Sequence, residues 1–113
     1  MTALLCLSTC PDMASAERLA ATLVEERLAA CVNLLPQLRA VYRWEGRVTR
    51  ADEVLLLAKT TGERFDALRT RILALHPYEL PEVIAVEIAA GLPAYLDWIA
   101  RETAMADTAE HPR

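Results

Sequence analysis

Residues 54–75, VLLLAKTTGERFDALRTRILAL, contain the passage from strand to helix that decides the fold. The run from Val54 to Ala58 is apolar at every position, so both faces of the predicted strand are apolar. Thr60-Thr61-Gly62-Glu63 then matches the capping box S/T-x-x-E, and apolar side chains recur behind it at helical spacing. This stretch therefore predicts a strand that runs to about Thr60 and a helix that Pro77 helps to stop.

The residues before this stretch predict a strand, a helix and a second strand. The first strand covers Leu4–Ser8, and Asp12 is a plausible N-cap for the helix that follows. An amphipathic pattern continues this helix to about Ala30.

The second strand covers Cys31–Trp44 and alternates polar and apolar residues from Leu38 onward. We expect a bend or bulge at Pro36, which has no N–H to donate to the sheet. Glu45-Gly46 is typical of a tight hairpin turn into the next strand.

The residues after the quoted stretch predict one more strand and a short helix. Val83–Ala90 is rich in β-branched residues, which favour strands. Gly91 breaks the chain, and Pro93 suits the first turn of a helix that ends near Glu102, with Tyr95, Leu96 and Ile99 on its packing side.

The predicted elements follow the order β-α-β-β-α-β, with one helix added at the end. This order belongs to the α+β class with the ferredoxin-like fold, in which two helices cover one face of a four-stranded antiparallel sheet. We expect one domain over residues 1–103 and a flexible C-terminal tail over residues 104–113, which are small, polar and charged.

The composition does not fit a nucleic-acid-binding or membrane-spanning protein. The 113 residues include 12 Lys and Arg against 16 Asp and Glu, a net charge of −4, and an acidic chain is not drawn to phosphate backbones. Its longest apolar runs are far shorter than the ~20 residues that a membrane-spanning helix needs. Cys6, Cys10 and Cys31 form no familiar zinc spacing and cannot all pair within one chain, which fits a reducing, cytoplasmic location.

Strands that are apolar on both faces predict an oligomer. A sheet with one face in water alternates apolar and polar residues, whereas the strands near residues 3–7, 54–58 and 83–88 do not. The last helix is too short to cover the open face, so we infer a homo-oligomer in which other copies cover it. The alternative is a monomer that tolerates a few exposed apolar side chains.

Five blocks of sequence together resemble the CutA family, named for divalent-cation tolerance. They are LAACVNLLP (28–36), VYRWEGRV (41–48), EVLLLAKTT (53–61), HPYELPEVIAV (76–86) and YLDWI (95–99). The resemblance implies a homotrimer of ferredoxin-like subunits, with a lateral cleft between subunits beside the loop after the second helix. It also implies a response to divalent metal ions, copper among them.

Cys31 and His76 are the candidate metal ligands, because soft and borderline divalent metals prefer thiolate and imidazole. Both lie in blocks that resemble the family. The competing interpretation is structural: His76 caps the end of its helix, and Cys31 packs where helix becomes strand. One Cys and one His do not complete a metal site, and the sequence leaves open whether they approach each other.

Seven charged and aromatic residues are candidates for lining a ligand cleft: Tyr42, Trp44, Glu53, Lys59, Tyr78, Glu82 and Trp98. Glu53 and Lys59 lie six apart on one face of a strand. With Glu82 they would bind a cation or an anionic ligand, or form salt bridges between subunits. The aromatic side chains would stack on a ring-bearing ligand or anchor a subunit interface.

The sequence contains no Ser-His-Asp set and no Gly-rich phosphate loop, so we expect a binding protein rather than an enzyme. The first hypothesis is a cytoplasmic homotrimer that contributes to divalent-cation tolerance by binding copper or a similar cation. The alternative is a regulatory protein, similar to the PII signalling proteins, that binds a small anionic ligand or a nucleotide in the cleft between subunits. A third possibility is a rigid scaffold without a ligand of its own.

Overall fold

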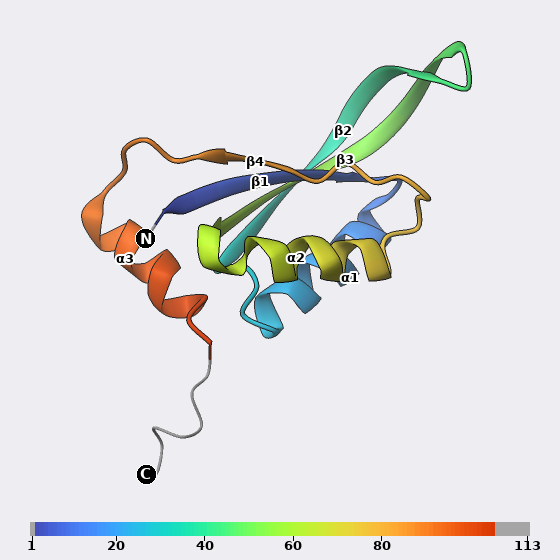
Figure 1. Cartoon of the computed structure of the whole chain (residues 1–113). Coiled ribbons are helices and arrows are strands. Elements are labelled where there is room, and N and C mark those ends of the chain that lie inside the picture. Colours follow the sequence, from blue (N-terminus) through green and yellow to red (C-terminus); the bar gives the residue numbers. More distant parts are fainter. Residues whose placement is uncertain (1, 106–113) are drawn as a thin grey trace.

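The computed structural model describes residues 2–105, which form four strands and three helices. In chain order they are β1 (Ala3–Cys10), α1 (Met13–Glu25), β2 (Cys31–Trp44), β3 (Arg47–Thr61), α2 (Gly62–Leu75), β4 (Ile84–Glu87) and α3 (Pro93–Glu102). The strands form one antiparallel sheet in the order β2-β3-β1-β4. Helices α1 and α2 lie together on one face of this sheet (Figure 1). The predicted ferredoxin-like fold with an added helix is confirmed, while residues 106–113 of the predicted tail lie outside the described residues.

The core lies between the sheet and the two helices. Alternate residues of the central strands β1 and β3 point into it and are at most 5% exposed: Cys6, Ser8, Cys10, Val54, Leu56 and Ala58. The buried stripe of α1 is the one that its spacing predicts: Ala16, Leu19, Ala20 and Leu23. Helix α2 adds Leu68 and Ile72. Because side chains alternate along a strand, this core also fixes which residues of the sheet face away from the helices.

The β2–β3 hairpin extends beyond the helices (Figure 1). Its register shifts between Leu35 and Leu38, where Gln37 has a φ of 65°, and this confirms the bulge predicted at Pro36. At the tip, Glu45 and Gly46 have φ values of 51° and 81°. Two consecutive residues with positive φ confirm the predicted tight turn, because this backbone twist matches that of the two strands.

Helix α1 ends at Glu25, earlier than the predicted end near Ala30. The chain leaves the helix through Arg27, which has a φ of 60°, a conformation that usually favours Gly or Asn. Contacts from α2 hold it there, since Arg64 donates through Nε to the carbonyl of Arg27 at 3.2 Å. The sequence carries no local stop signal at this point, so the periodicity alone placed the boundary too late.

Two further local predictions are wrong. The capping box does not form: Thr61 is the N-cap of α2 and makes no side-chain cap hydrogen bond. Thr60 still belongs to β3, and its hydroxyl donates to the carbonyl of Leu28 at 2.7 Å inside the core. Strand β4 covers residues 84–87 rather than 83–90. Its partner β1 begins at Ala3, whose carbonyl accepts from the N–H of Ile88, and the residues after Ile88 lie beyond the end of β1.

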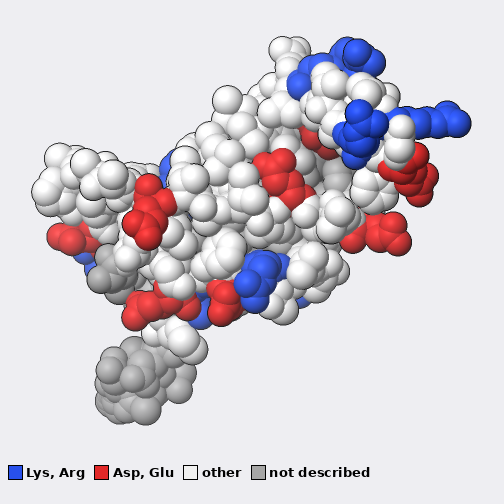
Figure 2. Space-filling view, turned by 45° about the horizontal axis from the view of Figure 1, so that its top comes forward, with Lys and Arg blue, Asp and Glu red and all other residues white. Residues whose placement is uncertain are grey.

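The sheet face away from the helices is not covered within one chain. Leu5, Leu7, Leu55 and Leu57 are partly buried there, and Ile84 and Val86 are each 53% exposed. Figure 2 shows this side as a largely uncharged surface, with basic side chains gathered at the far end of the hairpin. Apolar residues on both faces confirm the predicted pattern, and the oligomer inferred from it stays a prediction.

Helix α3 forms over Pro93–Glu102 as predicted and packs through Ile99, which is fully buried. Tyr95 was expected to pack as well, but it is 40% exposed. Within residues 2–105, no helix has both the length and the apolar character that a membrane crossing requires.

Candidate functional site

The loop between α2 and β4 faces the β2–β3 hairpin across a cleft of about 610 Å³. We call it the hairpin cleft. The side chains that characterise it are Tyr42, Trp44, Glu53, Tyr78, Glu79 and Glu82. Five of the seven predicted cleft residues are thus brought together by the fold, and Glu79 was missed although it lies between two of them in the sequence.

The bulge in β2 explains how the hairpin supplies its part of the cleft. After the register shift, Leu38 pairs with Glu53, and Tyr42 and Trp44 follow at even spacing on the same face of the hairpin. Without the extra residue at Gln37, every later side chain of β2 would face the other way relative to β3. The bulge therefore places the aromatic side chains on the face that carries the Glu53 carboxylate.

Glu53 lies at the floor of the cleft and is only 7% exposed. Its Oε2 accepts a hydrogen bond from the hydroxyl of Tyr78 at 2.8 Å. Burial, together with this hydrogen bond and the negative charge of Glu53, raises the pKa of Tyr78 far above its ordinary value. Tyr78 therefore stays protonated and acts as a donor to the carboxylate.

His76 fastens the loop to the end of β1. Its Nδ1 accepts a hydrogen bond from the backbone N–H of Tyr78 at 3.0 Å, and its Nε2 lies 2.6 Å from the carbonyl oxygen of Thr9. A carbonyl only accepts, so Nε2 carries the proton and the ring is the neutral tautomer that donates to Thr9. Both ring nitrogens are occupied, so a metal ion would have to displace one of these hydrogen bonds.

Cys10 is the thiol beside His76, with Sγ 3.7 Å from Nε2. It is fully buried, and burial raises the pKa of its thiol, so Cys10 stays protonated at neutral pH. The Nε2 atom that faces it is a donor already directed at Thr9. This Cys-His pair therefore lacks both the thiolate and the free base that nucleophilic catalysis needs.

Cys31 lies at the other end of the sheet and does not approach His76 within one chain. It pairs with Lys59, which in turn pairs with Leu5. His76 contacts Thr9 instead, four residues further along β1, or roughly 14 Å away along the strand. The two candidate metal ligands therefore cannot share an ion in one chain. Among residues 2–105, no group of three or more His, Cys, Asp or Glu side chains is placed to hold a metal ion.

Lys59 was expected in the cleft and is also at this far end. Its Nζ donates to Oδ1 of Asn33 and lies 3.9 Å from Sγ of Cys31. The even spacing from Glu53 correctly predicts a shared face. It does not predict a shared site, because six residues of strand extend roughly 20 Å.

Trp98 is likewise outside the hairpin cleft. It lies on α3 beside Tyr95, with ring centroids 5.4 Å apart. Burial and the neighbouring Cys31 raise the pKa of Tyr95, so these aromatic residues belong to the end of the sheet that carries Cys31. No periodicity in the sequence distinguishes the two ends.

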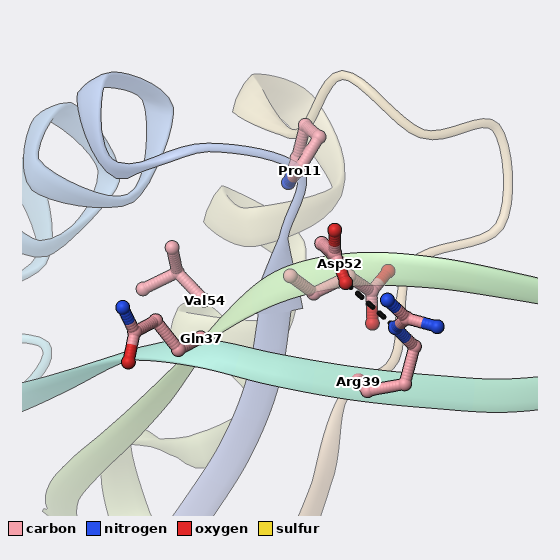
Figure 3. Close-up of a pocket in the computed structure, with 6 residues that line it drawn as sticks. Pro11, Gln37, Arg39, Asp52 and Val54 are labelled. Carbon is pink, nitrogen blue, oxygen red and sulfur yellow. Dashed lines mark hydrogen bonds and ion pairs between the residues drawn. The ribbon is translucent and has the colours of Figure 1, made fainter.

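A shallower pocket of about 480 Å³ lies beside the bulge and is lined by Pro11, Gln37, Arg39, Asp52, Glu53 and Val54 (Figure 3). Arg39 and Asp52 form an ion pair of 2.7 Å across the hairpin. Both side chains are largely exposed, so this pair contributes little to stability. Since Arg39 is already paired with Asp52, and Glu53 also lines the hairpin cleft, this shallower pocket is a weaker candidate for a ligand than the hairpin cleft.

Comparison with known proteins places the chain in a family. The family described as CutA1 divalent ion tolerance protein matches residues 4–102. The divalent-cation tolerance protein CutA of Thermus thermophilus is 50% identical over 97 residues, which cover 86% of this chain and 94% of that protein. The mouse protein CutA is 43% identical over 95 residues. These residues cover 84% of this chain and 54% of the mouse protein, so this chain spans about half the length of that relative.

The solved structures agree with the sequence relatives. The crystal structure of CutA from the bacterium Xylella fastidiosa has a TM-score of 0.88 to this chain at 50% identity, and the match covers 90% of this chain and 98% of that one. The resemblance carried by the five sequence blocks is confirmed over nearly all of the described residues. This chain belongs to the CutA1 family of divalent ion tolerance proteins.

Proposed function

We propose that this chain is a binding protein rather than an enzyme, and that it contributes to divalent-cation tolerance by binding copper or a similar divalent cation. The observation that carries the proposal is the family match over residues 4–102. The Thermus relative, half of whose aligned residues are identical, is named a divalent-cation tolerance protein.

The proposed assembly is a homotrimer in the cytoplasm. The uncovered face of the sheet supports an oligomer, because Ile84 and Val86 add exposed apolar area to a surface that already includes four leucines. Cys6, Cys10 and Cys31 are all unpaired, which supports a reducing compartment. Sedimentation equilibrium at micromolar concentration tests the assembly, and a mass of one chain would contradict it.

In this proposal Cys31 and His76 belong to separate metal contacts, each completed by water or by groups from another copy. Cys31 is partly exposed, but the Lys59 ammonium group beside it opposes a cation there unless the lysine turns away. His76 has to release Tyr78 or Thr9 before it can bind a metal. We therefore expect Cys31 to contribute more to metal affinity than His76.

Calorimetric titration of the reduced protein with copper, zinc and cobalt tests the metal role. We expect a dissociation constant tighter than about 0.1 mM for copper. Cys31→Ser should weaken binding more than His76→Asn, a variant that retains an acceptor for the Tyr78 N–H. Binding weaker than this for all three metals, or affinities that neither substitution changes, would contradict the proposal.

The alternative of an anionic ligand gains no support from the hairpin cleft of one chain. Three carboxylates line it, those of Glu53, Glu79 and Glu82. Lys59, the cation expected to bind an anion there, lies at the far end of the sheet.

A further inference from the structure

Cys31 and Lys59 form a pair of a thiol and an amine at the end of the sheet far from the hairpin cleft. They are register partners on the adjacent strands β2 and β3, so their side chains lie on the same face. Nζ of Lys59 lies 3.9 Å from Sγ of Cys31 and also donates to Oδ1 of Asn33, two residues further along β2. Asn33 therefore holds the amine beside the sulfur.

This pair does not depend on how many copies of the chain associate. Both residues belong to one chain, and the pairing of β2 with β3 places them next to each other. A second copy that covers this face of the sheet would lie over the pair without separating its members. Each residue is partly exposed in the single chain, and hydrogen peroxide, a natural oxidant of thiols, is little larger than water.

Lys59 is the side chain best placed to react with an oxidised Cys31. The other two thiols, Cys6 and Cys10, point into the core from the opposite face of the sheet and are 1% and 0% exposed. They therefore cannot form a disulfide with Cys31 in the folded chain. Lys59 is the only lysine of the chain, and the arginine side chains stay protonated and are not nucleophiles.

We infer that oxidation by hydrogen peroxide joins Cys31 to Lys59 through a sulfur–nitrogen bond. In the first step the thiol becomes a sulfenic acid: sulfur loses two electrons, takes up one oxygen atom of the peroxide, and one water leaves. In the second step Nζ attacks the sulfur, the S–O bond breaks and an S–N bond forms, which is the condensation that yields a sulfenamide. The ammonium group gives up two protons, one to the leaving hydroxide, which forms water, and one to the solvent.

The cross-link occupies the sulfur atom that the proposed metal role uses. This consequence rests on the proposed function, whereas the cross-link itself does not. An added thiol reverses the reaction, because it attacks the sulfur and releases the amine. Oxidation therefore removes the metal contact at Cys31 and reduction restores it, which makes the pair a redox control of cation binding.

Mass spectrometry of the full chain tests the cross-link. The metal-free protein is treated with hydrogen peroxide in the presence of a chelator. We expect its mass to fall by about 2 Da, the two hydrogen atoms lost, and to recover with dithiothreitol. The free thiols are then blocked under denaturing conditions and the chain is digested with trypsin. Because trypsin does not cleave after a modified lysine, residues 28–39 should be found joined to residues 51–64.

Three results would overturn the inference. The first is addition of oxygen to Cys31 without the joined peptide. The second is a mass loss confined to residues 28–39, which would mean that the sulfur had condensed with a backbone nitrogen. The third is a disulfide between the Cys31 residues of two copies, which a non-reducing gel would show.

Two substitutions examine the role of the amine. Lys59→Arg keeps the positive charge but removes the nucleophile, so the joined peptide should be absent and Cys31 should retain the added oxygen. Arg50→Lys, an exposed change on the hairpin, is the matched control and leaves the tryptic sites where they are. It should not alter the joined peptide, and a cross-link to the lysine introduced there would mean that proximity does not select Lys59. The peptide map of the unsubstituted chain keeps the test decisive if Lys59→Arg does not fold.

A copper titration of the cross-linked chain separates this inference from the proposed function. Its affinity for copper should fall as far as that of Cys31→Ser and recover with dithiothreitol. If the joined peptide forms while the affinity is unchanged, the metal contact at Cys31 and its redox control are wrong and the cross-link stands. If the joined peptide does not form, the cross-link is wrong whatever the titrations show.

Discussion

Replacing His76 by alanine tests the contact that holds the loop 76–83 on the end of β1. The substitution removes the donor to the Thr9 carbonyl and the acceptor for the Tyr78 N–H. His76 is 9% exposed, so both backbone groups are left with little access to water. A buried group without a partner costs about 1–3 kcal/mol. Two such groups are left, so we expect the free energy of unfolding to fall by about 2–6 kcal/mol.

Urea denaturation at one fixed protein concentration measures this change, since the midpoint of an oligomer depends on concentration. Two controls separate the two hydrogen bonds of His76. His76→Asn keeps an acceptor near the Nδ1 position, and His76→Gln keeps a donor near the Nε2 position. Each should lose about half as much as His76→Ala. A loss below about 1 kcal/mol for alanine, or equal losses for all three variants, would refute the assignment of His76 as a structural clamp.

Three further predictions concern the core and the hairpin. Burial and the Glu82 carboxylate raise the pKa of the Cys6 thiol from 9.0 to about 11. As the pH rises, the thiol ionises in the unfolded chain before it ionises in the folded one, so the free energy of unfolding should fall by about 2–3 kcal/mol between pH 9 and 11. The urea midpoint should decline less over this range in Cys6→Ala than in the unsubstituted protein. An equal decline in both would contradict the raised pKa of Cys6. The buried hydroxyl of Ser8 has no hydrogen-bond partner in residues 2–105, so Ser8→Ala should raise the free energy of unfolding by about 1 kcal/mol, and a lower melting temperature would contradict this. Glu45→Asn should stabilise the hairpin and Gly46→Val should destabilise it, each by roughly 1 kcal/mol, because both positions have positive φ. In thermal unfolding, the melting temperature should rise for Glu45→Asn and fall for Gly46→Val.

The sequence predicted the fold well wherever a local signal and the tertiary structure agree. Asp12 caps α1 by accepting a hydrogen bond from the N–H of Ser15, and Pro36 marks the bulge. The failures lie where a contact distant in sequence decides the local conformation. After α1, the carbonyl of Arg27 accepts a hydrogen bond from Arg64 of α2, and the hydroxyl of Thr60 donates to the carbonyl of Leu28 instead of capping α2. No pattern within a short window contains these partners.

The residues of the candidate site could also be predicted from the sequence only in part. Alternation placed Glu53 and Lys59 on one face correctly, but a face of a long strand contains more than one site. His76 and Tyr78 were recognised as candidates by residue type, whereas their partners Thr9 and Glu53 come from β1 and β3. Thr9 acts through its carbonyl group, which any residue would supply, so no sequence signal could have identified it.

The position of Glu53 on β3 links the bulge to the chemistry of the cleft. Val54, the next residue, belongs to the core, and Asp52, the previous one, pairs with Arg39 on the opposite face of the hairpin. Glu53 is therefore the point where β3 leaves the helical layer and becomes part of the projecting hairpin. The Glu53 side chain faces away from the helices, on the side where the loop after α2 lies against the hairpin. Its carboxylate accepts a hydrogen bond from the Tyr78 hydroxyl, so the residue at which the hairpin leaves the helical layer also holds the loop after α2 beside it.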